Sequence, residues 1–299
     1  YISPMKRVKK TKVGFIGLGI MGKPMVINLI KNDFEVFFYA RKKQVINEIL
    51  KIGGKFVSTP SDIPNHTKIC ITNLPNTKDV ESVVIGKRGL INNLRVGSVV
   101  IDMSTISPQG TIKINNKLKT KKSFLIDAPV SGGEAGAKSG ELSIMAGGDE
   151  KAYRKVKFIL AVLGNKITYI GRSGSGQICK ACNQILVAQT IQSISEIISI
   201  AKKSKINPSI IREALLAGYA NSKILEVHGN RMIKSDYRPG FKLSLHHKDL
   251  KIARTLTKSL GLNLRGLSQI QKVMKSAENS KLYECDSSII HTILEKTYK

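Results

Sequence analysis

Short apolar runs alternate with longer amphipathic stretches over residues 12–172, and this alternation restricts the fold more than any other feature of the chain. The runs have the length of buried strands, whereas intervening stretches such as Met25–Lys31 and Tyr153–Leu163 have helical periodicity. This pattern predicts a doubly wound α/β fold, a mostly parallel sheet with helices on both faces. The predicted strands are Val13–Ile16, Phe34–Tyr39, Ile69–Ile71, Val99–Ile101, Phe124–Ile126, Leu142–Met145 and Ile167–Ile170.

The pattern changes after Gly176. The segment Ile178–Lys203 is apolar almost all round a helix, which is typical of a helix buried between domains or between subunits. Downstream we expect only helices, one of which has Pro208 in its first turn. The breaks between the later helices are expected at Gly229, Pro239-Gly240 and Gly261. We therefore predict an α/β domain over residues 1–173 and an all-α domain over residues 174–299.

The composition fits an ordinary globular protein of two domains, except for its charge. The chain has 299 residues, 41% of them hydrophobic, and a formal net charge of +28. Such a charge is compatible with a nucleic-acid partner. However, Lys outnumbers Arg by 38 to 11, whereas phosphate and base contacts favour the arginine fork. We therefore favour a solvated cationic surface that attracts anionic ligands, and we do not expect nucleic-acid binding.

Cysteine usage and hydropathy indicate a reducing compartment. The four cysteines are too scattered for a disulfide framework. Cys179 and Cys182 form a C-x-x-C inside a predicted helix with no second ligand pair, so we interpret them as packing thiols and expect no metal. No apolar run reaches 18 residues, and residues 1–10 lack the apolar part of a secretory signal. We expect a cytoplasmic protein that does not bind membranes, with Met5 as its natural start.

A glycine-rich turn directly follows the first predicted strand and precedes a helix. The sequence Gly17-Leu-Gly-Ile-Met-Gly22 is a G-x-G-x-x-G motif in strand–turn–helix context. Gly17 suits the tight turn, Gly19 lets backbone amides approach a pyrophosphate, and Gly22 allows close packing of helix on strand. The helix N-terminus adds a positive end for phosphates. The motif predicts a dinucleotide contacted by Gly17, Leu18, Gly19, Ile20, Met21 and Gly22.

The end of the second predicted strand indicates which dinucleotide is preferred. An NAD site usually has an acidic residue there for the ribose 2′-hydroxyl. The chain instead reads Tyr39-Ala-Arg41-Lys42-Lys43, and Asp33 lies before the strand. Arg41 is placed to bind a 2′-phosphate, unless this is only an incidental basic loop. We therefore predict a preference for NADP(H), with NAD(H) also accepted.

Three further strand ends carry candidate binding residues. Carboxyl ends of parallel strands face the ligand crevice, so Leu74, Pro75 and Thr105 are candidates to line the cofactor. The fifth strand is followed by Ser131 and two glycines, Gly132 and Gly133. Their hydroxyl and amides are suited to cradle a carboxylate, although a plain Gly-Gly turn explains them equally well.

Lys180, Asn183 and Gln184 share one face of the long predicted helix, because they are three and four residues apart. An ammonium at Lys180 is suited to give a proton to a carbonyl oxygen during reduction, and the amide of Asn183 to orient it or to bind substrate. Spacing alone does not establish this role. Further on, Lys248 belongs to the stretch Leu245–Leu250, whose adjacent histidines we interpret as surface or packing residues.

These segments together resemble the 3-hydroxyacid (β-hydroxyacid) dehydrogenase family. The resemblance covers the chain from Lys12 to the C-terminus, and Asn183-Gln184 favours its tartronate semialdehyde reductase branch. In 3-hydroxyisobutyrate dehydrogenases, which remain an alternative, a second Asn usually follows the first. The motifs that carry the resemblance are GFIGLGIMGKPM at 14–25, DAPVSGGEAGAKSGELSIMAGG at 127–148, GSGQICKACNQ at 174–184 and PGFKLSLHHKDL at 239–250.

The resemblance implies roles that the residues alone only suggest. Lys180 would be the proton donor in reduction, Thr105 would contact the cofactor, and Lys248 would lie beside the nicotinamide. The substrate carboxylate would be held by Ser131, Gly132, Gly133 and Asn183. It further implies a Rossmann domain, a helical domain, a homodimer or homotetramer, and reduction of a small carboxylate semialdehyde such as tartronate semialdehyde to a hydroxy acid such as glycerate. The alternative of another class is a catalytically silent nucleic-acid-binding scaffold.

Overall fold

The computed structural model describes residues 10–298, so the expected start at Met5 lies outside the described residues. The chain divides into two compact units, residues 1–180 and 181–299. The division falls inside the long helix α8 (Ser175–Lys203), and the domain boundary predicted after residue 173 remains a prediction. Among the described residues, none of the helices combines the length and the apolarity that crossing a membrane requires.

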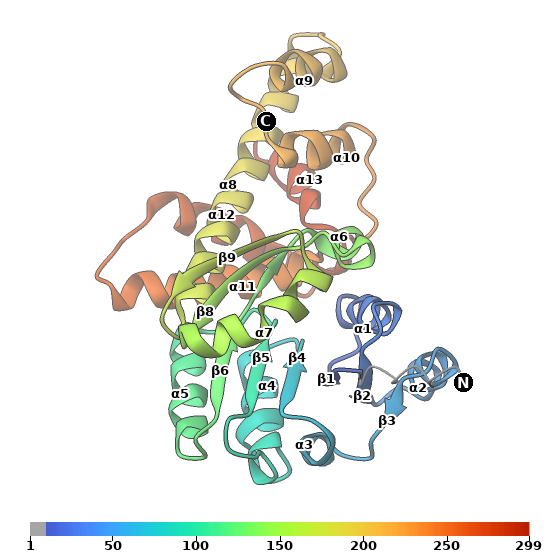
Figure 1. Cartoon of the computed structure of the whole chain (residues 1–299). Coiled ribbons are helices and arrows are strands. Elements are labelled where there is room, and N and C mark those ends of the chain that lie inside the picture. The colour runs from blue at the N-terminus through green and yellow to red at the C-terminus, as the bar shows by residue number, and fades with distance from the viewer. Residues whose placement is uncertain (1–9, 299) are drawn as a thin grey trace. The chain divides into compact units, whose positions relative to one another are not determined.

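The first unit contains one nine-stranded sheet (Figure 1). Its strands are β1 (Lys12–Ile16), β2 (Glu35–Tyr39), β3 (Lys55–Phe56), β4 (Ile69–Thr72), β5 (Val99–Asp102), β6 (Phe124–Asp127), β7 (Val130–Ser131), β8 (Ser143–Gly148) and β9 (Lys166–Gly171). Strands β3-β2-β1-β4-β5-β6 are parallel in that order, as in dinucleotide-binding sheets. β8 joins β6 antiparallel and also pairs with β7 and β9. All seven predicted strands are confirmed, and the predicted α/β fold with them.

Helices cover both faces of this sheet. Because successive strand residues point to opposite faces, Phe15 and Phe38 enter one core, and Ile16 and Phe37 enter the other. The helices of the unit are α1 (Gly22–Lys31), α2 (Lys43–Lys51), α3 (Ile63–His66), α4 (Thr77–Ile85), α5 (Pro108–Lys119), α6 (Gly133–Ser139) and α7 (Glu150–Leu163), with 3₁₀ turns η1 (Pro60–Asp62) and η2 (Leu90–Asn92). The first core includes apolar residues of α1, α2 and α7, and the second those of α3, α4 and α5. This arrangement presents the carboxyl ends of the parallel strands along one edge.

The second unit is helical, as predicted. It comprises most of α8 together with α9 (Pro208–Leu216), the π-helical turn η3 (Leu225–Gly229), α10 (Asn230–Ile233), α11 (Leu243–Ser259), α12 (Arg265–Ser276), η4 (Lys281–Glu284), η5 (Ser287–Ile289) and α13 (Ile290–Glu295). Pro208 occupies the first turn of α9, as predicted. α8 places Ala188 and Ile191 in the core of this unit, but Leu186 is 67% and Ile200 63% exposed. Within the single chain, α8 is therefore buried on one side only.

The predicted helix break at Gly229 is wrong. Gly229 has the right-handed helical angles φ −59° and ψ −45°, and η3 continues directly into α10. A Cβ added at Gly229 would lie 3.4 Å from Cδ of Arg212, an ordinary van der Waals distance, so neither the backbone angles nor the packing require glycine here. Gly261 does follow the end of α11, with φ of +71°.

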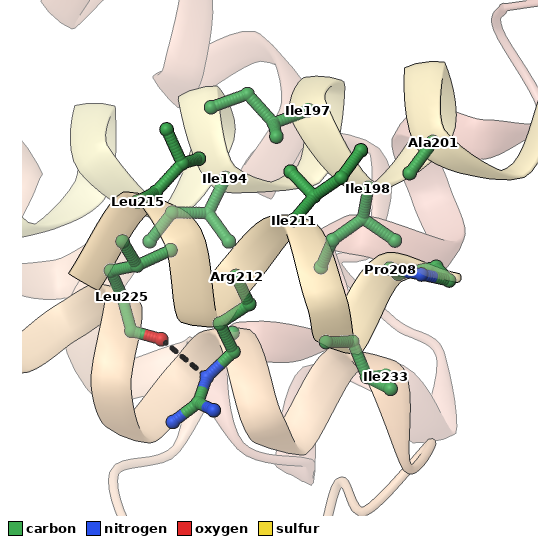
Figure 2. Close-up of a pocket in the computed structure, with 11 residues that line it drawn as sticks. Ile194, Ile197, Ile198, Ala201, Pro208, Ile211, Arg212, Leu215, Leu225 and Ile233 are labelled. Carbon is green, nitrogen blue, oxygen red and sulfur yellow. Dashed lines mark hydrogen bonds between the residues drawn. The ribbon is translucent and has the colours of Figure 1, made fainter. Parts of the chain in front are cut away.

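Arg212 of α9 also donates hydrogen bonds to backbone carbonyls of the irregular turn η3. Its Nε donates to the carbonyl of Leu225 at 3.2 Å, the dashed line in Figure 2, and its Nη2 donates to the carbonyl of Glu226 at 2.6 Å.

Beside Arg212, side chains of α8 and α9 face each other across a cavity of about 10 Å³ (Figure 2). A cavity of this size has room for about one water, but apolar walls of this kind normally keep it dry.

Candidate functional site

The glycine-rich turn after β1 is closely packed at two of its three glycines. Gly17 has φ of +99°, and a Cβ added there would lie 2.1 Å from the carbonyl oxygen of Asn73. A Cβ at Gly22 would lie 1.9 Å from the carbonyl oxygen of Gly17. By contrast, apart from Gly19 itself and its two chain neighbours, no described residue has a heavy atom within 4 Å of a Cβ added at Gly19. Gly17 and Gly22 are therefore required by packing, whereas Gly19 leaves open space of the kind that an approaching pyrophosphate occupies.

The loops after β4 and β5 are tied together beside this turn. Asn73 donates through Nδ2 to the carbonyl of Met103 at 3.0 Å. The backbone N–H of Leu74 donates to Oγ of Ser104 at 2.8 Å. These bonds fix two of the loops that carry predicted cofactor contacts, Leu74 and the neighbouring Thr105. Pro75, the third, is exposed.

The end of β2 presents a cation and no carboxylate. Arg41 is exposed in the short connection between β2 and α2. Lys42, at the N-cap of α2, is extended and makes no side-chain capping bond. The open N-terminus of α2 and the Arg41 guanidinium both suit an anion here. The geometry is thus compatible with the predicted 2′-phosphate contact.

Two buried carboxyl groups end the neighbouring strands β5 and β6. Asp102 and Asp127 are both fully buried and are partners in the strand register. Burial, together with the smaller effect of the charge of Asp127, raises the pKa of Asp102 to about 6, against the lowering effect of hydrogen bonds from Ser104 and Thr72. Burial also raises the pKa of Asp127, although several backbone N–H groups lower it. Neither aspartate was assigned a role from the sequence.

Ser131 and the two glycines lie at the end of β7, a strand not predicted from the sequence. Ser131 pairs with Ser143 of β8 and is partly exposed. Gly132 and Gly133 are exposed and have φ of +133° and +62°, conformations that favour glycine. Gly132 is the N-cap of α6 and Gly133 is its first residue, and both are exposed. Their role in carboxylate binding remains a prediction.

Lys180 lies early in α8 and is 7% exposed. One turn before it, the amide of Gln177 contacts the loop after β5: Oε1 accepts from the N–H of Ile106 at 3.1 Å, and Nε2 donates to the carbonyl of Ser104 at 2.8 Å. The first turn of the helix therefore starts at the carboxyl ends of the sheet. This is the edge where ligands of doubly wound sheets bind.

The second unit holds the other predicted site residues. Asn183 donates through Nδ2 to Oε1 of Gln184 at 2.7 Å, and Nε2 of Gln184 donates to Oδ2 of Asp249, also at 2.7 Å. Lys248 forms an ion pair with Asp249 at 2.8 Å. Nε2 of His246 donates to the carbonyl of Gln184 at 3.2 Å, so this buried histidine has a packing role, as predicted. Its neighbour His247 is also buried and bonds to the hydroxyl of Tyr283 at 2.8 Å.

The residues 10–298 include no group of three or more His, Cys, Asp or Glu side chains that would hold a metal ion. The site therefore consists of a glycine turn, polar strand ends and a buried ammonium. These are parts with which doubly wound sheets bind nicotinamide dinucleotides.

A doubly wound sheet with this glycine turn and a lysine at its carboxyl edge defines an NAD(P)-dependent oxidoreductase. The family model for the NAD binding domain of 6-phosphogluconate dehydrogenase matches residues 12–171. The model for the NAD-binding region of NADP-dependent 3-hydroxyisobutyrate dehydrogenase matches residues 174–294. The chain belongs to the 3-hydroxyacid dehydrogenase family, which confirms the resemblance inferred from the motifs.

Individual relatives support this assignment along almost the whole chain. The chain is 40% identical to 2-hydroxy-3-oxopropionate reductase of Escherichia coli over 95% of its own length and 97% of the relative's. It is 31% identical to 2-(hydroxymethyl)glutarate dehydrogenase of Eubacterium barkeri, with 96% of each chain covered. Among solved structures, 3-hydroxyisobutyrate dehydrogenase of Mycobacterium tuberculosis with L-serine superposes with a TM-score of 0.86 at 26% identity, covering 95% of this chain and 99% of that one.

Proposed function

We propose that the protein reduces the aldehyde of a small 3-oxo carboxylate with NAD(P)H, and that tartronate semialdehyde, which gives glycerate, is its substrate. The observation that carries this proposal is the position of Lys180, a buried ammonium on the first turns of α8, where Gln177 ties the helix to the strand ends. The 40% identity to 2-hydroxy-3-oxopropionate reductase supports the choice of substrate.

The cofactor, when bound, supplies the hydride; the chain supplies binding, orientation and a proton. The open space beside Gly19 would accommodate the pyrophosphate. Lys180 donates a proton from Nζ to the carbonyl oxygen as negative charge develops there, and it accepts that proton in the reverse direction. Ser131, Gly132 and Gly133 would hold the substrate carboxylate, and Asn183 would be a further substrate-binding residue. Thr105 and Lys248 would bind the cofactor.

Replacing Lys180 tests the proton transfer. In K180A we expect kcat to fall by about 100- to 10,000-fold, the usual contribution of a general acid, with the Kd for NADPH changed less than about threefold. Turnover is followed by NADPH absorbance, and binding by quenching of NADPH fluorescence. Near-normal kcat in K180A would remove Lys180 from the mechanism.

Arg41 tests the cofactor preference, which we propose to be NADP(H). The guanidinium forms charge-assisted bonds with a 2′-phosphate, so R41A should lower kcat/KM for NADPH by roughly 10- to 100-fold, about 1.4 to 2.7 kcal/mol, and leave NADH nearly unchanged. K43A, which removes a neighbouring exposed cation at the start of α2, is the matched control. Equal efficiency of the unmodified enzyme with NADH and NADPH would contradict the proposal.

A substrate panel separates the alternatives. Tartronate, methylmalonate and succinate semialdehydes, each tested with NADH and NADPH, distinguish a tartronate semialdehyde reductase from a 3-hydroxyisobutyrate dehydrogenase or another semialdehyde reductase. We expect the highest kcat/KM with tartronate semialdehyde. No turnover with any of them, together with salt-dependent retention on DNA, would instead favour the nucleic-acid-binding scaffold.

We also propose a homodimer or homotetramer. Exposed apolar side chains on α8 and α9 support this: Leu186, Ile200 and Ile210 are each more than 60% exposed in the single chain. Exposed apolar surface of this kind is commonly covered by a partner. Sedimentation velocity should give at least twice the mass of 32.8 kDa, and a monomer at working concentration would contradict the proposal.

A further inference from the structure

The N-terminus of α8 is held by a buried carboxylate at the end of β6. Asp127 accepts through Oδ1 from the N–H of Gly174 at 2.9 Å and through Oδ2 from the N–H of Gln177 at 3.1 Å. These N–H groups belong to the start of the helix, where no carbonyl of the same helix accepts them. The carboxylate therefore fixes the start of the helix that carries Lys180, and the positive end of the helix favours its charge.

Two glycines let the helix approach this carboxylate closely. A Cβ added at Gly176 would lie 2.3 Å from the carbonyl oxygen of Met145 and 2.9 Å from Oδ2 of Asp127. A Cβ at Gly147, on β8, would lie 2.8 Å from the N–H nitrogen of Gly176 and 2.9 Å from the same oxygen. The first turn of α8 is therefore packed, backbone to backbone, against the ends of β6 and β8.

Gln177 fixes the same turn from a second direction. Its side chain is 1% exposed, and its amide makes both of its bonds, from Ile106 and to Ser104, with the backbone on either side of Thr105. Ser104 in turn accepts from the N–H of Leu74. One buried amide thus connects the helix start to the loops proposed to line the cofactor.

We propose that Asp127 and Gln177 are positioning residues for Lys180, which hold its ammonium at the reacting oxygen without touching substrate or cofactor. This inference rests on the proposed function of Lys180. Gln177 and Lys180 are three residues apart, on one side of the helix and about 4.5 Å apart along its axis, so a shift of the first turn moves Lys180 with it. A displacement of about 1 Å at a reacting group lowers a rate by about 100-fold.

A positioning role and a merely structural role predict different measurements. Loss of positioning lowers kcat and leaves the fold and cofactor affinity unchanged. Loss of structure lowers the melting temperature and weakens NADPH binding together with kcat. The test must therefore report kcat, the NADPH Kd and thermal unfolding on the same variants of the full chain.

Q177M is the principal variant, since it keeps the length of the side chain and removes both hydrogen bonds. We expect a fall in kcat of about 10- to 100-fold, with the NADPH Kd changed less than about threefold. Q177E keeps the acceptor and loses the donor, so its kcat should be intermediate. Q192M is the matched control, because Gln192 lies on the same helix and bonds only to Glu196 one turn on; its kcat should equal that of the unmodified enzyme.

D127N tests the carboxylate. It replaces one of the two accepting oxygens with an amide NH2 group, so that one backbone N–H of the helix start faces another donor. We expect the same pattern as in Q177M, and where D127N does not fold, Q177M decides. Unchanged kcat in Q177M, or a loss of cofactor binding and melting temperature in proportion to kcat, would overturn the proposal.

The double variant K180A/Q177M separates this proposal from the function on which it rests. If Gln177 acts through Lys180, its loss should change the residual rate of K180A less than about twofold, whereas independent effects would multiply. If the kcat effects of the two substitutions multiply, the positioning role of Gln177 is wrong, but the proposed function of Lys180 is unaffected. A K180A variant with near-normal kcat overturns the proposed function instead. If K180A has no measurable rate, the kcat and the NADPH Kd of the single variant Q177M decide whether Gln177 has a positioning role.

Discussion

At the scale of single residues, Asp102 is the most unusual side chain of the first unit. Its Oδ1 accepts from Oγ1 of Thr72 at 2.9 Å and from the N–H of Ser104 at 3.1 Å. Its Oδ2 is buried, and among the described residues it has no hydrogen-bond partner. An ionised carboxylate in this position is poorly solvated, which is why its pKa is raised to about 6.

This raised pKa predicts a pH-dependent stability. The folded pKa of about 6 lies above the usual 3.8, so the folded chain binds the proton more tightly than the unfolded chain. The resulting stabilisation is complete below about pH 4 and is lost as the pH rises through 6, by up to about 3 kcal/mol. The free energy of unfolding of the unmodified protein, relative to D102N, should therefore fall between pH 4.5 and 7.5 in urea titrations.

A surface aspartate provides the control for this measurement. Asp33 is 85% exposed, and its φ of +63° is tolerated by Asn. D33N, measured in the same titrations, gives the effect of removing one exposed carboxylate. A difference between the unmodified protein and D102N that stays constant from pH 4.5 to 7.5 would show that Asp102 titrates normally.

At the scale of elements, the π-helical turn η3 depends on a side chain from α9. Arg212 donates to two carbonyls of this turn, those of Leu225 and Glu226. π-Helical turns are rare and disturb the regular bonding of a helix. The arginine fork therefore joins α9 to the irregular segment through bonds that a shorter or neutral side chain cannot replace.

Removing this fork should destabilise the helical unit. R212A leaves both carbonyls to water or unsatisfied, and we expect the free energy of unfolding to fall by about 1.5–3 kcal/mol, the usual effect for hydrogen bonds to a charged group. R212K keeps the charge but cannot donate two bonds from a planar fork, so it should recover less than half of the loss. Urea unfolding followed by circular dichroism measures both. A loss in R212A below about 0.5 kcal/mol, typical of a surface substitution, would contradict this role.

Elements with strong periodicity were predictable from the sequence, and irregular ones were not. Buried parallel strands are continuous apolar runs, so β1, β2, β4, β5, β6, β8 and β9 were found. β3 and β7 have two residues each and contain no such run. The predicted break at Gly229 was wrong because the glycine was interpreted as a backbone signal, whereas it has ordinary right-handed helical angles and η3 continues through it into α10.

In the candidate site, too, local features were predictable from the sequence and long-range contacts were not. The glycine turn was predictable because its chemistry is local to six residues. The contacts of Asp127 and Gln177 were not, since their partners lie 50 and 71 residues away along the chain. In the sequence these contacts are indicated only by an Asp at a strand end and a Gln after a glycine-rich turn. Many loops contain such residues, so they do not identify a positioning role. Such roles emerge only when the fold brings the segments together.

At the scale of the whole molecule, the charge of +28 is the main unexplained feature. Forty-nine cationic side chains face 21 acidic ones, so even complete pairing leaves an excess of 28 positive charges. The exposed ion pairs, such as Arg154–Glu150 and Lys138–Glu134, each contribute about 0–1 kcal/mol. We expect repulsion among the unpaired cations to outweigh these ion pairs and to oppose the compact state.

Added salt should consequently stabilise the folded protein. The screening length falls from about 30 Å at 0.01 M to about 8 Å at 0.15 M, which removes long-range repulsion and leaves contacts nearly unchanged. We expect the melting temperature to rise by several degrees over this range of NaCl, measured by scanning calorimetry. Replacing the exposed Lys155, Lys157 and Lys272 with Gln lowers the net charge to +25 (28 − 3), and this variant should melt higher at low salt and gain less from NaCl. A melting temperature that falls with NaCl would show instead that ion pairs dominate the electrostatics of the fold.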